Sequence, residues 1–247
     1  MSTTLSFTRE TTVGAIVAAQ PGLARLFEHL GIDYCCKGKQ TLVQACAQRG
    51  LDTATTLVLL QSAADALGDS PVEIDAAGMT LTQLADHIEN THHAYTKVEL
   101  PRLVEMADRV AAKHGSYDPR LFEVSASTRN LAEEMFDHME KEEVALFPLV
   151  RRIETETEGS CARSMIATPI RQMELEHDDA GRAINHLREL TDDFSTENPC
   201  CNTHRALLAG LAAFEADLHR HVHKENSILF PRVLELTSPS STQACTP

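Results

Sequence analysis

The sequence predicts an all-α protein of 247 residues, in which a small helical module precedes an up-down-up-down four-helix bundle. Two observations carry this prediction. Sustained alternation of β-branched and polar residues, which marks strands, is missing from the sequence, and aromatic residues make up only 4% of it. After Gly78, four long segments instead repeat apolar residues every three or four positions, as the buried face of a helix does.

Turn-forming residues place the boundary between the two parts. The segment from Gly68 to Gly78 has turn composition, so residues 1–70 are predicted to be the small module and residues 79–236 the bundle. Residues 237–247 are poor in apolar side chains and are expected to be a disordered tail.

Capping residues indicate where the helices begin. In the small module, helices are expected near Thr12, from Pro21, over residues 41–49 and over residues 52–67. In the bundle, Thr80 is a good N-cap, and Thr168-Pro169 combines an N-cap with proline at the first helical position. The bundle helices are therefore expected over residues 80–113, 119–153, 168–190 and 199–236.

Two of the bundle helices carry the same motif. HMEKEEVALFP begins at His138 and HVHKENSILFP begins at His221, and both read H-x-x-K-E-x-x-x-L-F-P. Glu142 and Glu225 follow their histidines by four residues, which places the two side chains of each pair on one face of a helix. A single pair of this kind is usually a solvated helix contact. Here both pairs lie on the apolar stripe that should face the core, which favours a buried site.

The third helix adds His177 to its own apolar stripe, between Met173 and Ala180. Two buried carboxylates without partners would be costly, and bound cations would remove that cost. Histidine and carboxylate ligands with open positions suit iron better than a closed zinc site. The motifs therefore predict a pair of metal ions bridged by the two carboxylates, with an oxide or hydroxide bridge to complete the charge balance.

The first bundle helix leaves its ligand ambiguous. The stripe through Leu81 and Leu84 centres on His92, whereas the stripe through Leu100 and Leu103 extrapolates back to His93, so periodicity leaves both histidines open. His114 is not expected to be a ligand, because a continuous helix with a rise of ~1.5 Å per residue would place it roughly 30 Å from His93.

The composition of the chain disfavours several classes of function. Acidic residues number 36 against 22 basic ones, and a net charge of −14 disfavours binding to nucleic acid. The sequence shows neither an apolar run long enough to span a membrane nor a signal-peptide pattern, so we expect a cytoplasmic protein that binds no membrane. Seven cysteines, an odd number, are more typical of free thiols than of a disulfide framework.

With these motifs the chain resembles the bacterial iron–sulfur cluster repair di-iron proteins, in which a short cysteine-bearing domain precedes a hemerythrin-like bundle. The resemblance rests on IDYCCKGKQTL in the N-terminal part and on HHAYTKVELP, HMEKEEVALFP, LEHDDAG and HVHKENSILFP in the bundle. It implies two iron ions, bridged by Glu142 and Glu225, and it favours His93 over His92. The implied ligands are His93, His138, Glu142, His177, His221 and Glu225.

The resemblance also implies a role. Members of the family are linked to nitric-oxide and oxidative stress, and relatives in denitrifying bacteria are thought to bind nitric oxide. We therefore expect a non-enzymatic protein that helps repair damaged iron–sulfur clusters by donating iron, with the proteins that carry such clusters as partners. A nitric-oxide-binding protein is the alternative, an oxygen carrier or a di-iron oxidase or reductase is less favoured, and a homodimer remains open.

The adjacent thiols of Cys35 and Cys36 lie outside the bundle. Neighbouring cysteines form a strained ring when oxidised, which argues against a structural disulfide. They are either inert thiols of a small core or a functional dithiol. Lys37 and Lys39 would favour thiolates, and with the resemblance we predict a functional dithiol. The pair Cys200-Cys201 has no comparable companion residues, and its role stays open.

Overall fold

The computed structural model describes residues 7–67, 76–155 and 165–237. Over these ranges the backbone forms helices, together with one isolated bridge between Thr12 and Thr41, and it forms no strands. The prediction of an all-α fold is confirmed. The predicted Gly68–Gly78 turn and the predicted tail lie largely outside the described residues, although Thr237 still belongs to the last helix.

The small module consists of short helices joined by capped turns. They are α1 (Val13–Ala19), a 3-10 turn (Pro21–Leu23), α2 (Ala24–His29), α3 (Leu42–Arg49) and α4 (Thr53–Leu67). The Thr12 hydroxyl accepts a hydrogen bond from Ala15 N, and Thr41 forms a reciprocal capping box with Gln44. The loop between α2 and α3 carries Cys35 and Cys36.

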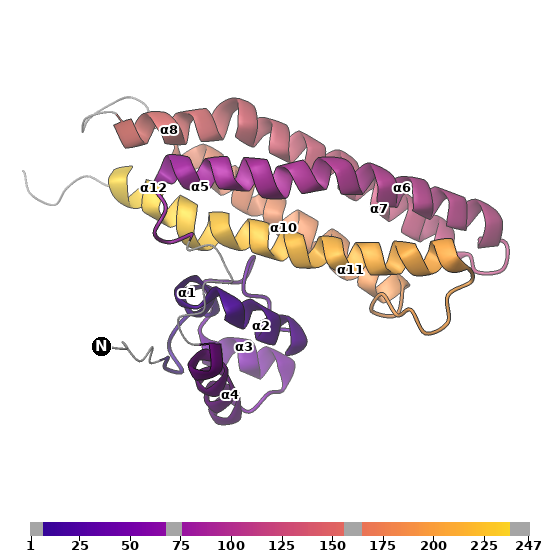
Figure 1. Cartoon of the computed structure of the whole chain (residues 1–247), viewed down its shortest axis with the longest axis horizontal. Helices are drawn as coiled ribbons and strands as arrows, with labels where there is room; N and C mark the ends of the chain where they lie inside the picture. The colour runs from indigo at the N-terminus through magenta and orange to yellow at the C-terminus, as the bar shows by residue number, and fades with distance from the viewer. Residues whose placement is uncertain (1–6, 68–75, 156–164, 238–247) are drawn as a thin grey trace, which may run out of the picture.

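The four bundle helices run up, down, up and down (Figure 1). The first comprises α5 (Leu81–Ile88), η2 (Glu89–His93) and α6 (Ala94–His114), and the second comprises α7 (Arg120–Lys141), η3 (Glu142–Leu146) and α8 (Phe147–Thr155). The third is α10 (Ala167–Leu190), and the fourth comprises α11 (Asn202–His223), η4 (Lys224–Leu229) and α12 (Phe230–Thr237). Each η segment is a π-helical stretch within an otherwise α-helical rod.

Two of the predicted helix starts differ from the structure. The third helix begins at Ala167 with Ile166 at the N-cap, so Thr168 and Pro169 lie inside its first turn, where a missing proline N–H does no harm. The fourth helix begins at Asn202 rather than near Pro199, because Cys201 has an extended backbone and occupies the N-cap. Thr80 is the N-cap of α5, as predicted, and shares a capping box with Gln83.

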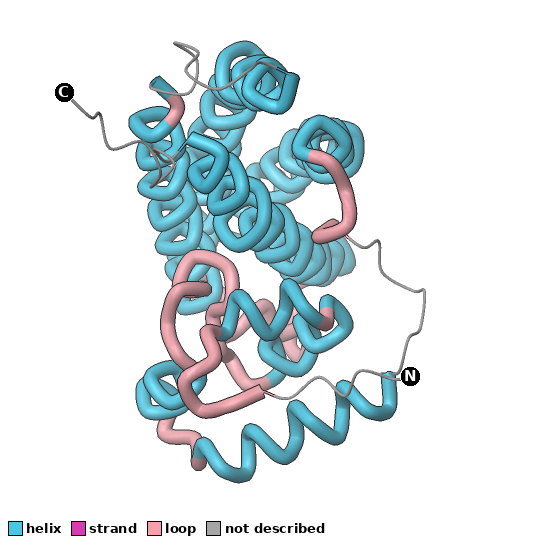
Figure 2. The backbone as a smooth tube through the Cα atoms, turned by 90° about the vertical axis from the view of Figure 1, so that its left-hand side faces the viewer, coloured by secondary structure: helices cyan, strands magenta, loops and turns pink. Residues whose placement is uncertain are grey.

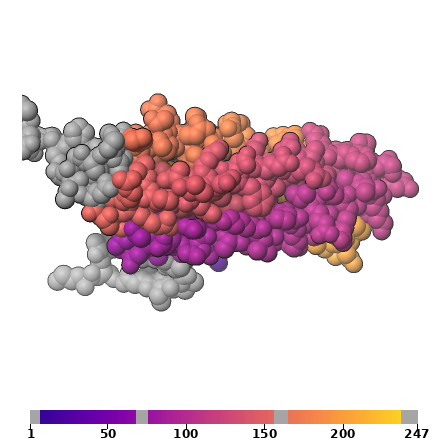
Figure 3. Space-filling model, turned by 90° about the horizontal axis from the view of Figure 1, so that it is seen from above, coloured from indigo at the N-terminus to yellow at the C-terminus, as the bar shows by residue number. Residues whose placement is uncertain are grey.

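The small module packs along one side of the bundle, below α11 in Figure 1, and Figure 2 shows the same arrangement at right angles. One apolar cluster joins the two parts: it contains Ile16, Phe27 and Leu42 of the module together with Leu103 and Leu211 of the bundle. Seen from above, the first three bundle helices form a continuous elongated surface (Figure 3). None of the described helices has the length and hydropathy needed to cross a membrane.

The buried apolar residues of the bundle form two clusters with a polar layer between them. On the second helix, Met135 belongs to one cluster and Leu146 to the other. On the third helix, Met173 and Ala180 are divided in the same way. The predicted ligands of both helices fall between these boundaries, so the fold places them in one layer across the bundle.

Candidate metal centre

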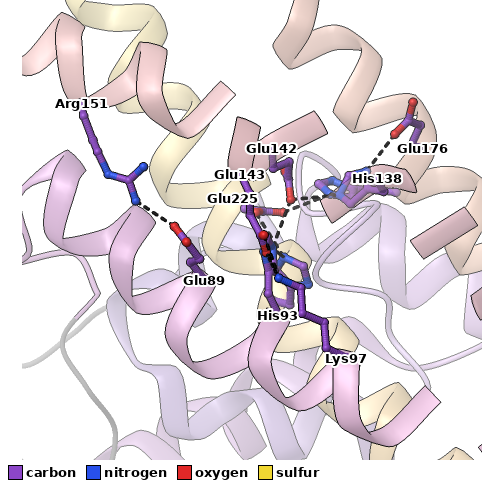
Figure 4. Close-up of polar contacts among 11 residues, drawn as sticks. Glu89, His93, Lys97, His138, Glu142, Glu143, Arg151, Glu176 and Glu225 are labelled. Carbon is purple, nitrogen blue, oxygen red and sulfur yellow. Dashed lines mark hydrogen bonds and ion pairs between the residues drawn. The ribbon is translucent and has the colours of Figure 1, made fainter. Parts of the chain in front are cut away.

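The six side chains predicted as ligands meet in this polar layer. His93 ends η2, His138 lies near the end of α7, Glu142 begins η3, His177 lies in α10, His221 lies near the end of α11 and Glu225 lies in η4. Every one of them is at most 3% exposed. Figure 4 shows His93 of the first bundle helix, His138 and Glu142 of the second and Glu225 of the fourth converging on one place.

Three of the four bundle helices become π-helical where they carry these residues. A π-helical turn holds one residue more than an α-helical turn and is frequent at functional sites. The extra residue keeps the apolar residues on both sides of the segment directed toward the core while it changes the orientation of the residues within it. The sequence pattern did not predict these segments.

The ligand atoms form two groups that share both carboxylates. His93 and His221 belong to one group and His138 and His177 to the other, and Glu142 and Glu225 belong to both. The ligand atoms of each group lie within 4.8 Å of one another. A shared carboxylate is the arrangement needed to bridge two cations.

The spacing of the imidazole nitrogens fits a cation in each group. Nε2 of His93 lies 3.2 Å from Nε2 of His221, and Nε2 of His138 lies 3.1 Å from Nε2 of His177. Two nitrogens that bind one ion at ~2.1 Å and at about a right angle would lie ~3 Å apart. Each Nε2 also lies close to a shared carboxylate, as in the pairs His138–Glu142 at 3.3 Å and His177–Glu225 at 3.0 Å.

The two carboxylates of the centre are buried, and few hydrogen-bond donors surround them. Both oxygens of Glu142 and Oε2 of Glu225 are buried without a hydrogen-bond partner among the described residues. Burial and the charge of Glu225 push the pKa of Glu142 upward, but His138 and His93 outweigh them and lower it. Burial likewise opposes the charged form of Glu225, yet His221 and His177 hold its pKa well below the usual value. Buried carboxylates with unused lone pairs fit bound cations.

The histidines would have to give up protons to bind a metal. Burial lowers the pKa of His138, but the charge and hydrogen bond of Glu142, together with Glu176 and Glu225, outweigh burial and raise the pKa to about 10. Without a cation, therefore, protons on the imidazoles balance the carboxylates. Because a metal ligand must be the neutral imidazole, a cation that enters the site releases these protons.

Three residues fix the ligand rings from outside. Nδ1 of His93 lies 2.8 Å from Glu143, Nδ1 of His138 lies 2.9 Å from Glu176, and Nδ1 of His177 lies 3.0 Å from Oδ1 of Asn226. Such contacts set the tautomer and direct Nε2 toward the centre. Sequence analysis missed these three residues, although each directly adjoins a predicted ligand in the chain.

Phenylalanines of the repeated motif cover the centre on one side. Phe147 stacks on His93 with a centroid distance of 5.6 Å, and Phe230 stacks on His177 with a centroid distance of 6.1 Å. Both phenylalanines are fully buried or nearly so. The L-F-P part of each motif thus supplies an apolar wall that excludes water from the ligands.

His92, the other candidate of the first helix, points elsewhere. Its Nδ1 lies 3.0 Å from Asp217, its Nε2 lies 3.0 Å from the Lys224 amine, and its ring stacks on the ring of His221. The structure therefore brings His93, and not His92, into the centre. His114 is the last residue of α6, far along the helix from His93, as the helix rise predicts.

The dithiol loop lies against the bundle. Cys35 is buried and Cys36 is partly exposed, and the Cys36 thiol donates a hydrogen bond to the carbonyl of His177 at 3.4 Å. The expectation that lysines would favour a thiolate is wrong for Cys35: its pKa is raised by the hydrogen bond with Cys36, by burial and by the charge of Asp33. Lys39 instead pairs with Glu174 at 2.6 Å.

The second cysteine pair lies elsewhere. Cys200 is exposed and Cys201 is partly exposed at the start of α11. The backbone N–H of Cys200 donates to Nδ1 of His204 at 3.2 Å, and neither thiol belongs to the polar layer of the bundle.

A helical bundle with two carboxylate-sharing histidine groups defines a class of cation-binding protein, and comparison with known families agrees. Residues 84–233 match the Hemerythrin HHE cation binding domain, so this chain carries a metal-binding domain. Residues 9–64 match a Domain of Unknown function (DUF542).

Relatives specify the family more closely. The chain is 34% identical to the iron-sulfur cluster repair protein YtfE of Musicola paradisiaca (strain Ech703) over 226 residues, which cover 92% of this chain and 97% of the relative. It is 35% identical, over 227 residues and the same shares, to the proteins of that name from Yersinia pestis (strain Pestoides F) and Yersinia pseudotuberculosis serotype O:1b (strain IP 31758). The chain belongs to this YtfE family of hemerythrin-domain proteins, and the resemblance inferred from its motifs is confirmed.

Proposed function

We propose that each of the two ligand groups holds one iron ion and that Glu142 and Glu225 bridge the pair. The observation that carries this proposal is the membership of both carboxylates in both groups. Imidazole and carboxylate donors suit iron, and the absence of thiolates from these two groups disfavours a closed zinc site. When bound, the ions supply redox and Lewis-acid chemistry, and the surrounding residues hold their ligands in place.

We further propose that this centre serves the repair of damaged iron–sulfur clusters by giving up iron, and that the protein acts in the cytoplasm. The names of the relatives support this role. The electrostatics of the centre also support it, because protons on the histidines can replace the cations and keep the two buried carboxylates balanced. Proteins with damaged clusters would be the recipients.

A repair assay tests this role directly. The iron-loaded protein is incubated anaerobically with a dehydratase whose cluster has been damaged, and both recovered dehydratase activity and iron lost from the bundle are followed. We expect activity to return in step with iron loss. Recovery that proceeds equally well with metal-free protein would remove the centre from the mechanism.

A second candidate function is the binding of nitric oxide. Each group provides four donors, two imidazoles and two carboxylates, which leaves positions free on a six-coordinate iron ion for a small ligand. Titration of the reduced protein with nitric oxide, followed by absorption and electron paramagnetic resonance, tests it. Saturable binding together with no repair activity would favour this function over the first.

A further inference from the structure

We propose that Asp33, Cys35 and Cys36 form a second metal site, for a divalent transition metal, outside the histidine–carboxylate centre. One ligand atom from each of the three residues lies within 4.8 Å of the others. All three residues belong to the loop between α2 and α3, and none of them is used by the centre in the bundle.

The distances within the loop fit ligands of one ion. Sγ of Cys35 lies 3.8 Å from Sγ of Cys36, and Sγ of Cys35 lies 3.2 Å from Oδ1 of Asp33. Two sulfurs that bind one ion at ~2.3 Å with a tetrahedral angle would lie ~3.8 Å apart. The two thiols are therefore already spaced as ligands, and the carboxylate lies beside them.

The loop backbone holds the carboxylate in this position. Oδ1 of Asp33 accepts hydrogen bonds from the backbone N–H groups of Cys35 at 3.1 Å, Cys36 at 3.0 Å and Lys37 at 3.3 Å. These bonds wrap the loop around the carboxylate and direct it at the Cys35 thiol. A site arranged in advance loses less conformational entropy when an ion binds.

Binding requires the exchange of two protons for one cation. The Cys35 thiol donates to Asp33, and its pKa is raised by the hydrogen bond with Cys36, by burial and by the carboxylate. The negative carboxylate that disfavours an anionic sulfur also attracts a cation, and the cation in turn stabilises the thiolates. Both thiol protons leave to solvent, the ion keeps its oxidation state, and no electron is transferred.

The two thiols border two cavities. Cys35 and Cys36 line a cavity of about 260 Å³ together with Glu174 and Asp178. They also line a larger cavity of about 1150 Å³ between the small module and the α10–α11 side of the bundle. Three protein ligands leave a fourth position facing these cavities, which water or a ligand from a recipient protein could fill. An open coordination sphere suits exchange of the ion rather than storage.

The site also lies next to the centre in the bundle. The Cys36 thiol contacts the carbonyl of His177 and passes close to Gly181, where an added Cβ would lie 3.3 Å from its sulfur. Thus the loop approaches α10 beside a residue of the centre. A role in passing iron from the centre to a recipient rests on the proposed function, whereas binding of a metal by the loop does not.

Cobalt(II) is the probe that tests this site. The full-length protein, loaded with iron and reduced under anaerobic conditions, is titrated with Co²⁺ while the sulfur-to-cobalt charge-transfer absorption in the near ultraviolet is followed. We expect a saturable band in the wild type and its loss in the Cys35→Ser, Cys36→Ser variant. Asp33→Asn, which keeps both thiols, should bind Co²⁺ at least about tenfold more weakly.

The adjacent pair Cys200 and Cys201 provides the matched control. A Cys200→Ser, Cys201→Ser variant has lost the same number of thiols and should keep the band. A band that is missing from the wild type, that survives in the Cys35→Ser, Cys36→Ser variant, or that disappears in the control would overturn the proposal. The iron content of the Cys35→Ser, Cys36→Ser variant, which lacks the thiol ligands of the loop, reports on the bundle centre by itself, so failure of the proposed function is distinguished from failure of this site.

Discussion

Oε1 of Glu143 lies 2.8 Å from Nδ1 of His93, and the Lys97 amine lies 2.6 Å from the same oxygen. The arrangement recurs in the other group, where Glu176 contacts His138 (Figure 4) and also pairs with Lys141. Hydrogen bonds with His138, Lys141 and Gln172 together lower the pKa of Glu176 to about 2. In both groups, therefore, an ionised carboxylate held by a lysine fixes the histidine ring.

Replacement of Glu143 tests this arrangement. Glu143→Gln keeps the shape of the side chain but removes its charge, so the His93 ring loses a strong acceptor and becomes a poorer metal ligand. We expect iron(II) affinity, measured by competition with a chelator, to fall by about 10–100-fold. Glu133→Gln, a change at an exposed position of α7, should leave the affinity unchanged. Equal affinities for the two variants would show that Glu143 plays no part in holding the ligand.

Replacement of a shared carboxylate should affect both iron ions. Glu142→Gln or Glu225→Gln should lower iron content and weaken the magnetic coupling between the ions, because each carboxylate belongs to both groups. Metal analysis and Mössbauer spectroscopy measure the two effects. A double variant with full iron content and unchanged coupling is incompatible with bridging.

Three histidines of the first bundle helix are expected to differ in their importance for iron binding. His93→Ala should lower the iron content, since His93 lies 3.2 Å from both His221 and Glu142 in the centre. His92→Ala and His114→Ala should keep both ions, because His92 contacts Asp217 and Lys224 and His114 ends α6. Metal analysis of the three purified variants decides the matter. Retention of iron by His93→Ala together with loss of iron by His92→Ala would reverse the assignment.

Helix periodicity was sufficient to find most of the centre. Residues such as Met135 and His138 share one stripe because a helix repeats every 3.6 residues, and that stripe is buried in the fold. The π-helical segments could not be found in the same way. The apolar stripe of an α-helix already alternates between steps of three and four residues. One extra residue is hidden in that variation, so a segment such as Glu142–Leu146 still fits a continuous α-helix.

Contacts between distant parts of the chain could not be predicted from the sequence either. Cys36 and His177 are 141 positions apart, and no periodic pattern connects them. Lys39 is three residues from Cys36 in the chain, but its amine pairs with Glu174 of α10. Proximity in sequence predicted an electropositive environment for the thiols, whereas the folded loop places the carboxylate of Asp33 beside Cys35.

The hydrogen bonds of Glu154 predict how the stability of the fold depends on pH. Its carboxylate accepts hydrogen bonds from the backbone N–H groups of Leu81 at 2.7 Å and Thr82 at 3.0 Å, at the start of α5. Burial opposes the charged form, but the bonds from Thr82 and Leu81 outweigh it and lower the pKa. A lowered folded-state pKa adds stability above the unfolded-state value of about 4.3, and this stability is lost as the pH falls through the folded-state value.

Glu154→Gln should therefore lower the free energy of unfolding of the metal-free protein at neutral pH. Because the side chain is exposed, we expect a loss of about 1 kcal/mol or less. The difference from wild type should shrink at about pH 3, below the unfolded-state pKa, because the unfolded state then binds the proton. Urea unfolding at the two pH values measures it, with the exposed Glu140→Gln as control. A difference that grows on acidification contradicts the expected sign.

The last prediction concerns the division of labour between the two parts of the chain. Cys35 and Cys36 lie outside both ligand groups of the bundle, and the hydrogen bond from Cys36 to His177 goes to the backbone carbonyl rather than to a ligand atom. A serine hydroxyl at position 36 can still donate to that carbonyl. The Cys35→Ser, Cys36→Ser variant should therefore keep its iron and its spectrum, and it should still bind nitric oxide when reduced.

If the dithiol passes iron to a recipient, the same variant should fail in the repair assay. The Cys200→Ser, Cys201→Ser variant should repair as the wild type does, because its thiols lie at the start of α11, outside the polar layer. Unimpaired repair by the Cys35→Ser, Cys36→Ser variant would remove the dithiol from the mechanism. Loss of the di-iron spectrum from that variant would instead make the thiols part of the bundle centre, contrary to the separation between the loop and the ligand groups.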